Sequence, residues 1–153
     1  VGELYARGFR TFLCGMAMGF DLAAAEAVLA CRDSETGSAF SPAAAPDPHF
    51  PHTPMPGLRL VAVIPFRGQD RERFRRVLAA ANHSVTLSPS YHAGCYAVRN
   101  NYLVEHAALL VAWYDGSPGG THYTVRRALG RGLEFINLHP HPAALRQAEP
   151  TLF

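Results

Sequence analysis

The sequence predicts an α/β protein in which helices cover both faces of a doubly wound, mostly parallel sheet. Short apolar runs alternate with helical patterns along the chain, and this alternation is typical of parallel strands joined by right-handed crossovers. The 153 residues, of which 48% are hydrophobic and 17% charged, suit one packed domain of ordinary size. We therefore expect a single three-layer α/β/α domain over residues 1–140.

The first third of the chain indicates a helix end, a strand and a second helix. Gly8 follows a helical pattern over residues 2–7 and can close that helix, because glycine adopts the left-handed cap conformation at low cost. The segment RTFLCG predicts a strand near residues 11–15, and DLAAAEAVLACR predicts a helix with Asp21 at or near its N-cap. Six prolines and no sustained period mark residues 33–57 as an irregular, exposed insertion.

The rest of the chain indicates further strands that alternate with helices. The continuous apolar run LRLVAVIPF is typical of a strand covered on both faces. Helical patterns follow in DRERFRRVLAAAN, CYAVRNNYLVEHA and THYTVRRALGR. We expect the remaining strands near residues 58–65, 84–88, 108–114 and 134–138, and a proline-rich C-terminal tail over residues 141–153.

Composition excludes several classes of function. The formal net charge of +2 argues against a strongly basic surface for nucleic acid. Cys14, Cys31 and Cys95 are too few and too scattered for a disulfide framework, which favours a reducing, cytoplasmic setting. No apolar run is long enough to span a bilayer, so we expect no membrane partner. His49 and His52 lack a third ligand at a suitable spacing, so we expect no metal.

Candidate binding residues lie in the loops that join a strand to the next helix, because ligands of α/β sheets bind beyond the carboxyl ends of the strands. The loops over residues 15–21 and 115–121 are rich in glycine. Glycine lets backbone N–H groups approach an anion, and the helix N-terminus that follows favours phosphate. Alternatively, Gly15 serves tight packing and Gly119-Gly120 is only a turn. Neither the Walker pattern nor the Gly-x-Gly-x-x-Gly fingerprint is present.

Two blocks of sequence resemble a known superfamily. The segment CGMAMGFDLAAAEA is similar to the glycine-rich loop of the SLOG superfamily, with Cys14 where serine is usual. GCYAVRNNYLVEHAALLVAWYDGSPGGTHYTVRRA resembles blocks of the YpsA family, in the same order. The resemblance covers most of residues 3–139. It implies a Rossmann-like fold and a pocket, formed by both glycine loops, for a nucleotide or nucleotide derivative.

The resemblance also suggests roles for single residues. Asp21 is either a helix cap or a ribose-binding carboxylate. Arg99 stands where the related Lonely-guy phosphoribohydrolases carry a substrate-binding arginine, and its alternative is a surface salt bridge. The predicted ligand-binding residues are Gly15, Met16, Gly19, Asp21, Arg99, Asn100, Asp115, Gly119, Gly120 and Thr121.

Two departures from the related families limit what the resemblance implies. Lonely-guy enzymes follow their glycines with a glutamate that takes part in cleaving the N-glycosidic bond, whereas Thr121 here is followed by His122, Tyr123, Thr124 and Val125. Glu26 and Glu105 lie on helices, and we assign neither a catalytic role. The YpsA family also has a strand before the helix with which this chain begins, and that first strand is missing here.

Three functions follow as hypotheses. The leading one is binding or sensing of a nucleotide-derived small molecule such as NAD or ADP-ribose. The alternative is hydrolysis of a nucleotide N-glycosidic bond, so whether the chain is an enzyme stays open. Binding of single-stranded DNA, as in DprA-like proteins, is disfavoured because it needs a basic groove. No cofactor is expected, and a homo-oligomer is left open.

Overall fold

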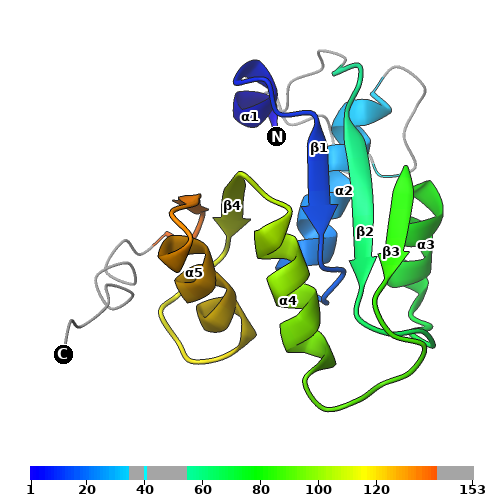
Figure 1. The fold of residues 1–153 in the computed structure, drawn as a ribbon. Coiled ribbons are helices and arrows are strands. Elements are labelled where there is room, and N and C mark those ends of the chain that lie inside the picture. The colour runs from blue at the N-terminus through cyan, green and yellow to red at the C-terminus, as the bar shows by residue number, and fades with distance from the viewer. Residues whose placement is uncertain (35–39, 41–54, 141–153) are drawn as a thin grey trace. The chain divides into compact units, whose positions relative to one another are not determined.

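The structure of this chain is a computed structural model that describes residues 1–34, 40 and 55–140 (Figure 1). Its helices alternate with strands that pair in parallel, which confirms the predicted α/β class and is consistent with a Rossmann-like fold. The chain divides into two compact units, Val1–Ser90 and Tyr91–Phe153. The expectation of a single domain stays a prediction.

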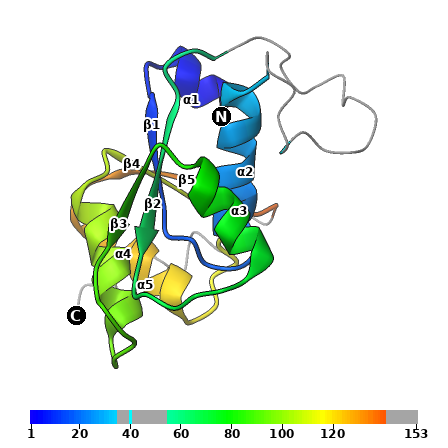
Figure 2. The same cartoon turned by 90° about the vertical axis from the view of Figure 1, so that its right-hand side faces the viewer.

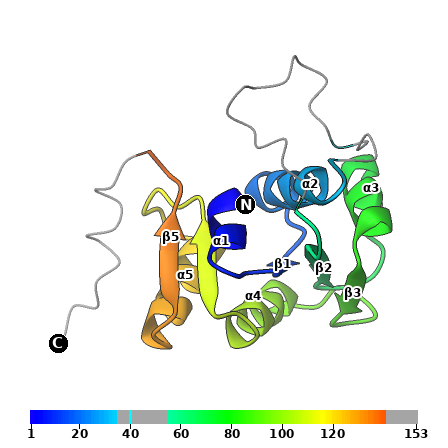
Figure 3. The same ribbon diagram turned by 90° about the horizontal axis from the view of Figure 1, so that it is seen from above.

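Unit 1 contains a three-stranded parallel sheet with the order β1-β2-β3. Cys14 of β1 pairs with Ala62 of β2, which pairs in turn with Ser84 of β3. Figures 2 and 3 show α2 and α3 side by side on one face of this sheet. The elements of unit 1 are α1 (Gly2–Ala6), β1 (Thr11–Cys14), α2 (Phe20–Arg32), β2 (Arg59–Ile64), α3 (Glu72–Ala80) and β3 (His83–Thr86).

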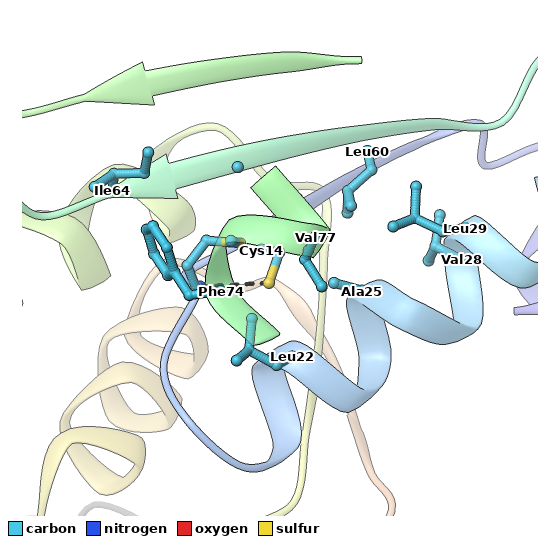
Figure 4. Close-up of a cluster of buried hydrophobic side chains, with 11 residues drawn as sticks. Cys14, Leu22, Ala25, Val28, Leu29, Leu60, Ile64, Phe74 and Val77 are labelled. Carbon is cyan, nitrogen blue, oxygen red and sulfur yellow. Dashed lines mark hydrogen bonds between the residues drawn. The ribbon is translucent and has the colours of Figure 1, made fainter. Parts of the chain in front are cut away.

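The core of unit 1 lies between this sheet and its two helices (Figure 4). Leu22, Ala25 and Leu29 are buried on one stripe of α2, as the 3.6-residue period requires. Phe74 and Val77 of α3 are one turn apart and pack into the same cluster. Alternate residues of β2 complete it from the sheet. The first helix ends as predicted, with glycine at positive φ after its last turn.

Unit 2 contains the two-stranded parallel sheet β4-β5, in which Ala112 pairs with Asn137. Val125 of α5 packs against Ala112 and Tyr114 in a separate core. Helix α4 lies beside α5, as Figure 1 shows. The elements of unit 2 are α4 (Cys95–Glu105), β4 (Leu109–Ala112), α5 (Gly120–Gly130) and β5 (Glu134–Asn137).

The five predicted strands all form, each within a few residues of its expected bounds. Among the described residues, β1, β2 and β3 form one parallel sheet within unit 1, and β4 and β5 form another within unit 2. Apolar periodicity reports that a strand is buried but not which strand lies next to it. Most of the predicted insertion over residues 33–57, with His49 and His52, and the tail over residues 141–153 lie outside the described residues.

Among the described residues, neither a metal-binding cluster nor a membrane-spanning helix is found. Within residues 1–34, 40 and 55–140, no three His, Cys, Asp or Glu side chains are grouped so that they could hold a metal ion. None of the described helices combines the length and the apolar character needed to cross a bilayer.

Candidate functional site

The first glycine loop runs from the end of β1 to the start of α2. Gly19 is the N-cap of α2, and its φ of 93° lies in the region that favours glycine. Met16 has a φ of 60°, which is uncommon for a residue with a side chain, and is only 2% exposed. Gly15 beside it is also buried. This loop is therefore held by the core beneath it.

Asp21 is the second residue of α2 and not its N-cap. Its carboxylate Oδ2 accepts a hydrogen bond from the backbone N–H of Ala17 at 3.2 Å. The carboxylate therefore does not cap α2, and it ties the preceding loop to the first turn of the helix. A ribose contact stays untested.

Cys14 closes the same loop through its thiol. Sγ accepts a hydrogen bond from the N–H of Met16 at 3.4 Å and donates to the carbonyl oxygen of Asp21 at 3.2 Å. A thiol is a weak donor and a weak acceptor, so Cys14 fills both roles that a serine hydroxyl would fill. The only sequence signal for this role was the cysteine at a position where the resembling families have serine.

The second glycine loop runs from the end of β4 to the start of α5 and is exposed. Asp115, Gly119, Gly120 and Thr121 are all exposed. The Asp115 carboxylate accepts hydrogen bonds from the hydroxyl and the N–H of Ser117, at 2.5 and 2.9 Å, and these bonds lower the pKa of Asp115. Gly119 has φ 148° and ψ −165°, which is a conformation essentially restricted to glycine.

Arg99 and Asn100 are buried in the middle of α4 and connect this helix to the start of α5. They are 7% and 6% exposed. Nε of Arg99 donates to Oδ1 of Asn100 at 2.8 Å, and Nδ2 of Asn100 donates to the carbonyl oxygen of Gly120 at 3.4 Å. The structure therefore brings three predicted site residues together within unit 2. A surface salt bridge does not fit the burial of Arg99.

Sequence analysis missed a contact between a buried tyrosine and a half-buried histidine in unit 2. The phenol oxygen of Tyr114, which is 1% exposed, lies 2.5 Å from Nδ1 of His122 in the first turn of α5. Tyr123 donates to Oδ1 of Asn101 at 2.8 Å. The sequence did hold one signal for this contact. Tyr114 follows β4 and His122 lies in the first turn of α5, so both are close to the loop where a ligand site is expected.

Glu26 and Glu105, the two helical glutamates considered from the sequence, each accept hydrogen bonds from an arginine. Oε1 and Oε2 of Glu26 accept hydrogen bonds from Nε and Nη2 of Arg73 at 2.9 and 2.7 Å, which lowers the pKa of Glu26. Oε1 of Glu105 accepts one from Nη2 of Arg127 at 2.9 Å.

Comparison with known proteins adds no family assignment. No protein-family model matches this chain, and no curated protein matches it significantly. The resemblance to the SLOG superfamily and the YpsA family therefore stays a prediction from the two motif blocks. The predicted convergence of the two glycine loops also stays a prediction, because the loops belong to different units.

Proposed function

We propose that the start of α5 binds the phosphate part of a nucleotide-derived small molecule, such as NAD or ADP-ribose. The observation that carries this proposal is Gly120, whose place in the fold does not require glycine. A Cβ added there would lie 3.7 Å from Nδ2 of Asn100, an ordinary contact, and its φ does not lie in the left-handed region. Because Gly120 is exposed and has no side chain, a ligand can approach the N-terminus of α5 from solvent.

The backbone at this point offers donors to an anion. The first N–H groups of any α-helix have no acceptor within the helix, and no side chain caps α5. The first hydrogen bond of the helix is donated by the N–H of Tyr123 to the carbonyl oxygen of Gly119 at 3.0 Å. The N–H groups of Gly120, Thr121 and His122 therefore precede the ladder and, together with the helix dipole, favour phosphate.

Arg99 supplies positive charge behind this backbone. The Arg99 guanidinium bonds to Asn100, and Asn100 bonds in turn to the carbonyl oxygen of Gly120, so these bonds join the guanidinium to the start of α5. A charge-assisted hydrogen bond from such a group contributes about 1.5–3 kcal/mol. The first glycine loop enters the proposal through the resemblance alone, because its polar side chains bond within that loop.

The test compares two glycines of the same helix. Gly120→Val should weaken binding of ADP-ribose or NAD at least about tenfold, since the side chain occupies the space at the helix start. Gly130→Val is the matched control, because Gly130 also lies in α5, has no atom within 4 Å of an added Cβ and has no left-handed φ. Binding is measured by calorimetry and folding by thermal unfolding.

The proposal is wrong if the parent chain binds neither nucleotide. It is also wrong if folded Gly120→Val binds as tightly as the parent, or if Gly130→Val weakens binding equally. Gly120→Ala provides a milder change for which the structure has room, so a loss of binding there separates steric exclusion of the ligand from unfolding.

A further inference from the structure

A second feature of α5 lies along the side of the helix, on its first two turns. His122, Tyr123, Arg126 and Arg127 line a pocket of about 370 Å³. Two of these side chains are permanently cationic and a third is an imidazole. No acidic residue is among the four. We propose that this α5 pocket binds the phosphate group of a small molecule, through the guanidinium groups of Arg126 and Arg127 and the ring of His122.

Arg127 has a hydrogen-bond donor to spare. Its Nη2 bonds to Oε1 of Glu105 at 2.9 Å, whereas Nε, which lies on the same edge of the guanidinium, is buried and has no hydrogen-bond partner among the described residues. Most buried polar groups are hydrogen-bonded, so an unpaired one calls for a partner. Nε itself is buried, whereas the Arg127 side chain as a whole is 37% exposed and contributes its positive charge to the pocket that it lines.

Arg126 lies one turn from His122 and is exposed. Within the part of the chain that the structure describes, no ion pair of Arg126 is found. Its guanidinium is therefore not neutralised by a neighbouring carboxylate there. A second arginine beside Arg127 gives the pocket two groups of the kind that bind phosphate through paired N–H donors.

His122 is held in place by Tyr114. The phenol oxygen of this buried tyrosine lies 2.5 Å from Nδ1 and fixes the orientation of the imidazole. When the Tyr114 hydroxyl donates to Nδ1, the neutral ring carries its hydrogen on Nε2, on its other side. Nε2 then donates to the anion. Donors from three side chains suit the tetrahedral oxygens of a phosphate better than the two coplanar oxygens of a carboxylate.

This pocket and the site proposed at the start of α5 share His122 but use different groups of it, the ring in the pocket and the backbone N–H in the nucleotide site. The pocket uses side chains of the helix flank, whereas the proposed nucleotide site uses backbone N–H groups and Gly120. Gly120→Val should therefore leave the pocket intact, and a failure of either proposal can be distinguished from a failure of the other.

The test is a titration of the full chain with inorganic phosphate at constant ionic strength. It follows the backbone amide and arginine Nε–H signals in ¹H–¹⁵N NMR spectra. We expect saturable shifts at residues 122–127. Arg126→Gln should raise the dissociation constant about tenfold, the factor that corresponds to about 1.4 kcal/mol. Arg131→Gln is the matched control, because this exposed arginine follows the same helix but does not line the pocket.

A third variant changes binding in the opposite direction. Glu105→Gln weakens the bond to Nη2 of Arg127 and removes a negative charge beside the pocket, so phosphate should bind about threefold more tightly. The proposal is supported if phosphate binding saturates, becomes weaker in Arg126→Gln, and keeps the parent's dissociation constant in Arg131→Gln and in Gly120→Val. Shifts that do not saturate, or equal losses in both arginine variants, overturn it, because they would indicate only the general positive charge of the helix. A titration with acetate separates phosphate from carboxylate, and tighter binding of acetate also contradicts the proposal.

Discussion

The two glycine loops both contain glycines and one acid, but their surroundings differ. In the loop over residues 15–21, Met16 is 2% exposed, and the Cys14 thiol and the Asp21 carboxylate both bond to the loop backbone. In the loop over residues 115–121, Gly119 and Gly120 are exposed, and the Asp115 carboxylate bonds to Ser117 of the same loop. Neither α2 nor α5 has a side-chain cap. The first loop is held from its buried side through Cys14 and Met16, whereas the second is held by an exposed acid.

The two interhelical ion pairs show the same contrast. Arg73 joins α3 to α2 through two hydrogen bonds to Glu26. Arg127 joins α5 to α4 through one bond to Glu105 and keeps a buried Nε without a partner among the described residues. In unit 1, Arg73 uses two of its nitrogens to hold α3 against α2. In unit 2, Arg127 uses only one nitrogen to hold α5 against α4. This contrast is why both proposals concern α5.

The largest effect should come from removing the buried side chain of the first loop. Met16→Ala should lower the free energy of unfolding by about 2–5 kcal/mol, because the deletion leaves a cavity in the core of unit 1. Urea unfolding followed by circular dichroism measures the change. Thr121→Ala in the exposed second loop is the control and should produce no measurable loss. Equal stabilities of both variants would remove the distinction between the loops.

The second loop has one position where the backbone needs glycine and one where it does not. Gly119→Ala should destabilise the chain by about 1–3 kcal/mol, since its φ of 148° and ψ of −165° are strained for any side chain. Gly120→Ala should fold like the parent, because the added Cβ meets only an ordinary contact. Thermal unfolding of the two variants measures this difference, and a larger loss for Gly120→Ala would contradict it.

A smaller effect distinguishes the two loop acids. Asp21→Asn should lower stability by about 1 kcal/mol, because it weakens the bond from the Ala17 N–H and removes an acid from the first turn of α2. Asp115→Asn changes an exposed carboxylate that accepts hydrogen bonds from Ser117, two residues further along the same loop, and should have no measurable effect on urea unfolding. A stronger effect at Asp115 would show that the second loop also depends on its acid.

The elements were predictable from sequence because apolar period and glycine position are local signals. The strands and the helix end at Gly8 depend only on nearby residues. The pairing of strands into two sheets depends on long-range contacts, which no local pattern encodes. Arg99, Asn100 and Gly120 were each predicted as site residues, but the hydrogen bonds that join them depend on how α4 packs against α5.

The sequence could not distinguish the roles of the two loops. Both contain glycines and an acid, and only the structure shows that Asp21 bonds to its own loop while Gly120 has room for a side chain. The contact of Tyr114 with His122 spans a loop whose path sets the distance. The single bond between Arg127 and Glu105 depends on how α4 packs against α5, which cannot be derived from either helix alone.

The smallest expected effect compares the two ion pairs as the pH changes. The hydrogen bonds from Arg73 lower the folded-state pKa of Glu26 from its ordinary value of 4.5. A carboxyl whose pKa is lower in the folded state stabilises the fold above the unfolded-state pKa, and this contribution disappears as the pH falls through the folded-state value. Arg73→Gln should therefore lower stability by about 0.5–1 kcal/mol at neutral pH, an amount limited by the partial exposure of the pair.

Below about pH 4.5 the difference between Arg73→Gln and the parent should shrink and vanish, since the protonated Glu26 no longer attracts the guanidinium. Arg127→Gln, which removes only one hydrogen bond to Glu105, should cost less at neutral pH. Arg75→Gln removes a pair with Asp70 in which the side chains are 62% and 79% exposed, and should cost nothing measurable. Urea unfolding across this pH range orders the three variants. If Arg127→Gln were the most destabilising, α5 would depend on its arginine for folding, and that residue would have less capacity to bind phosphate.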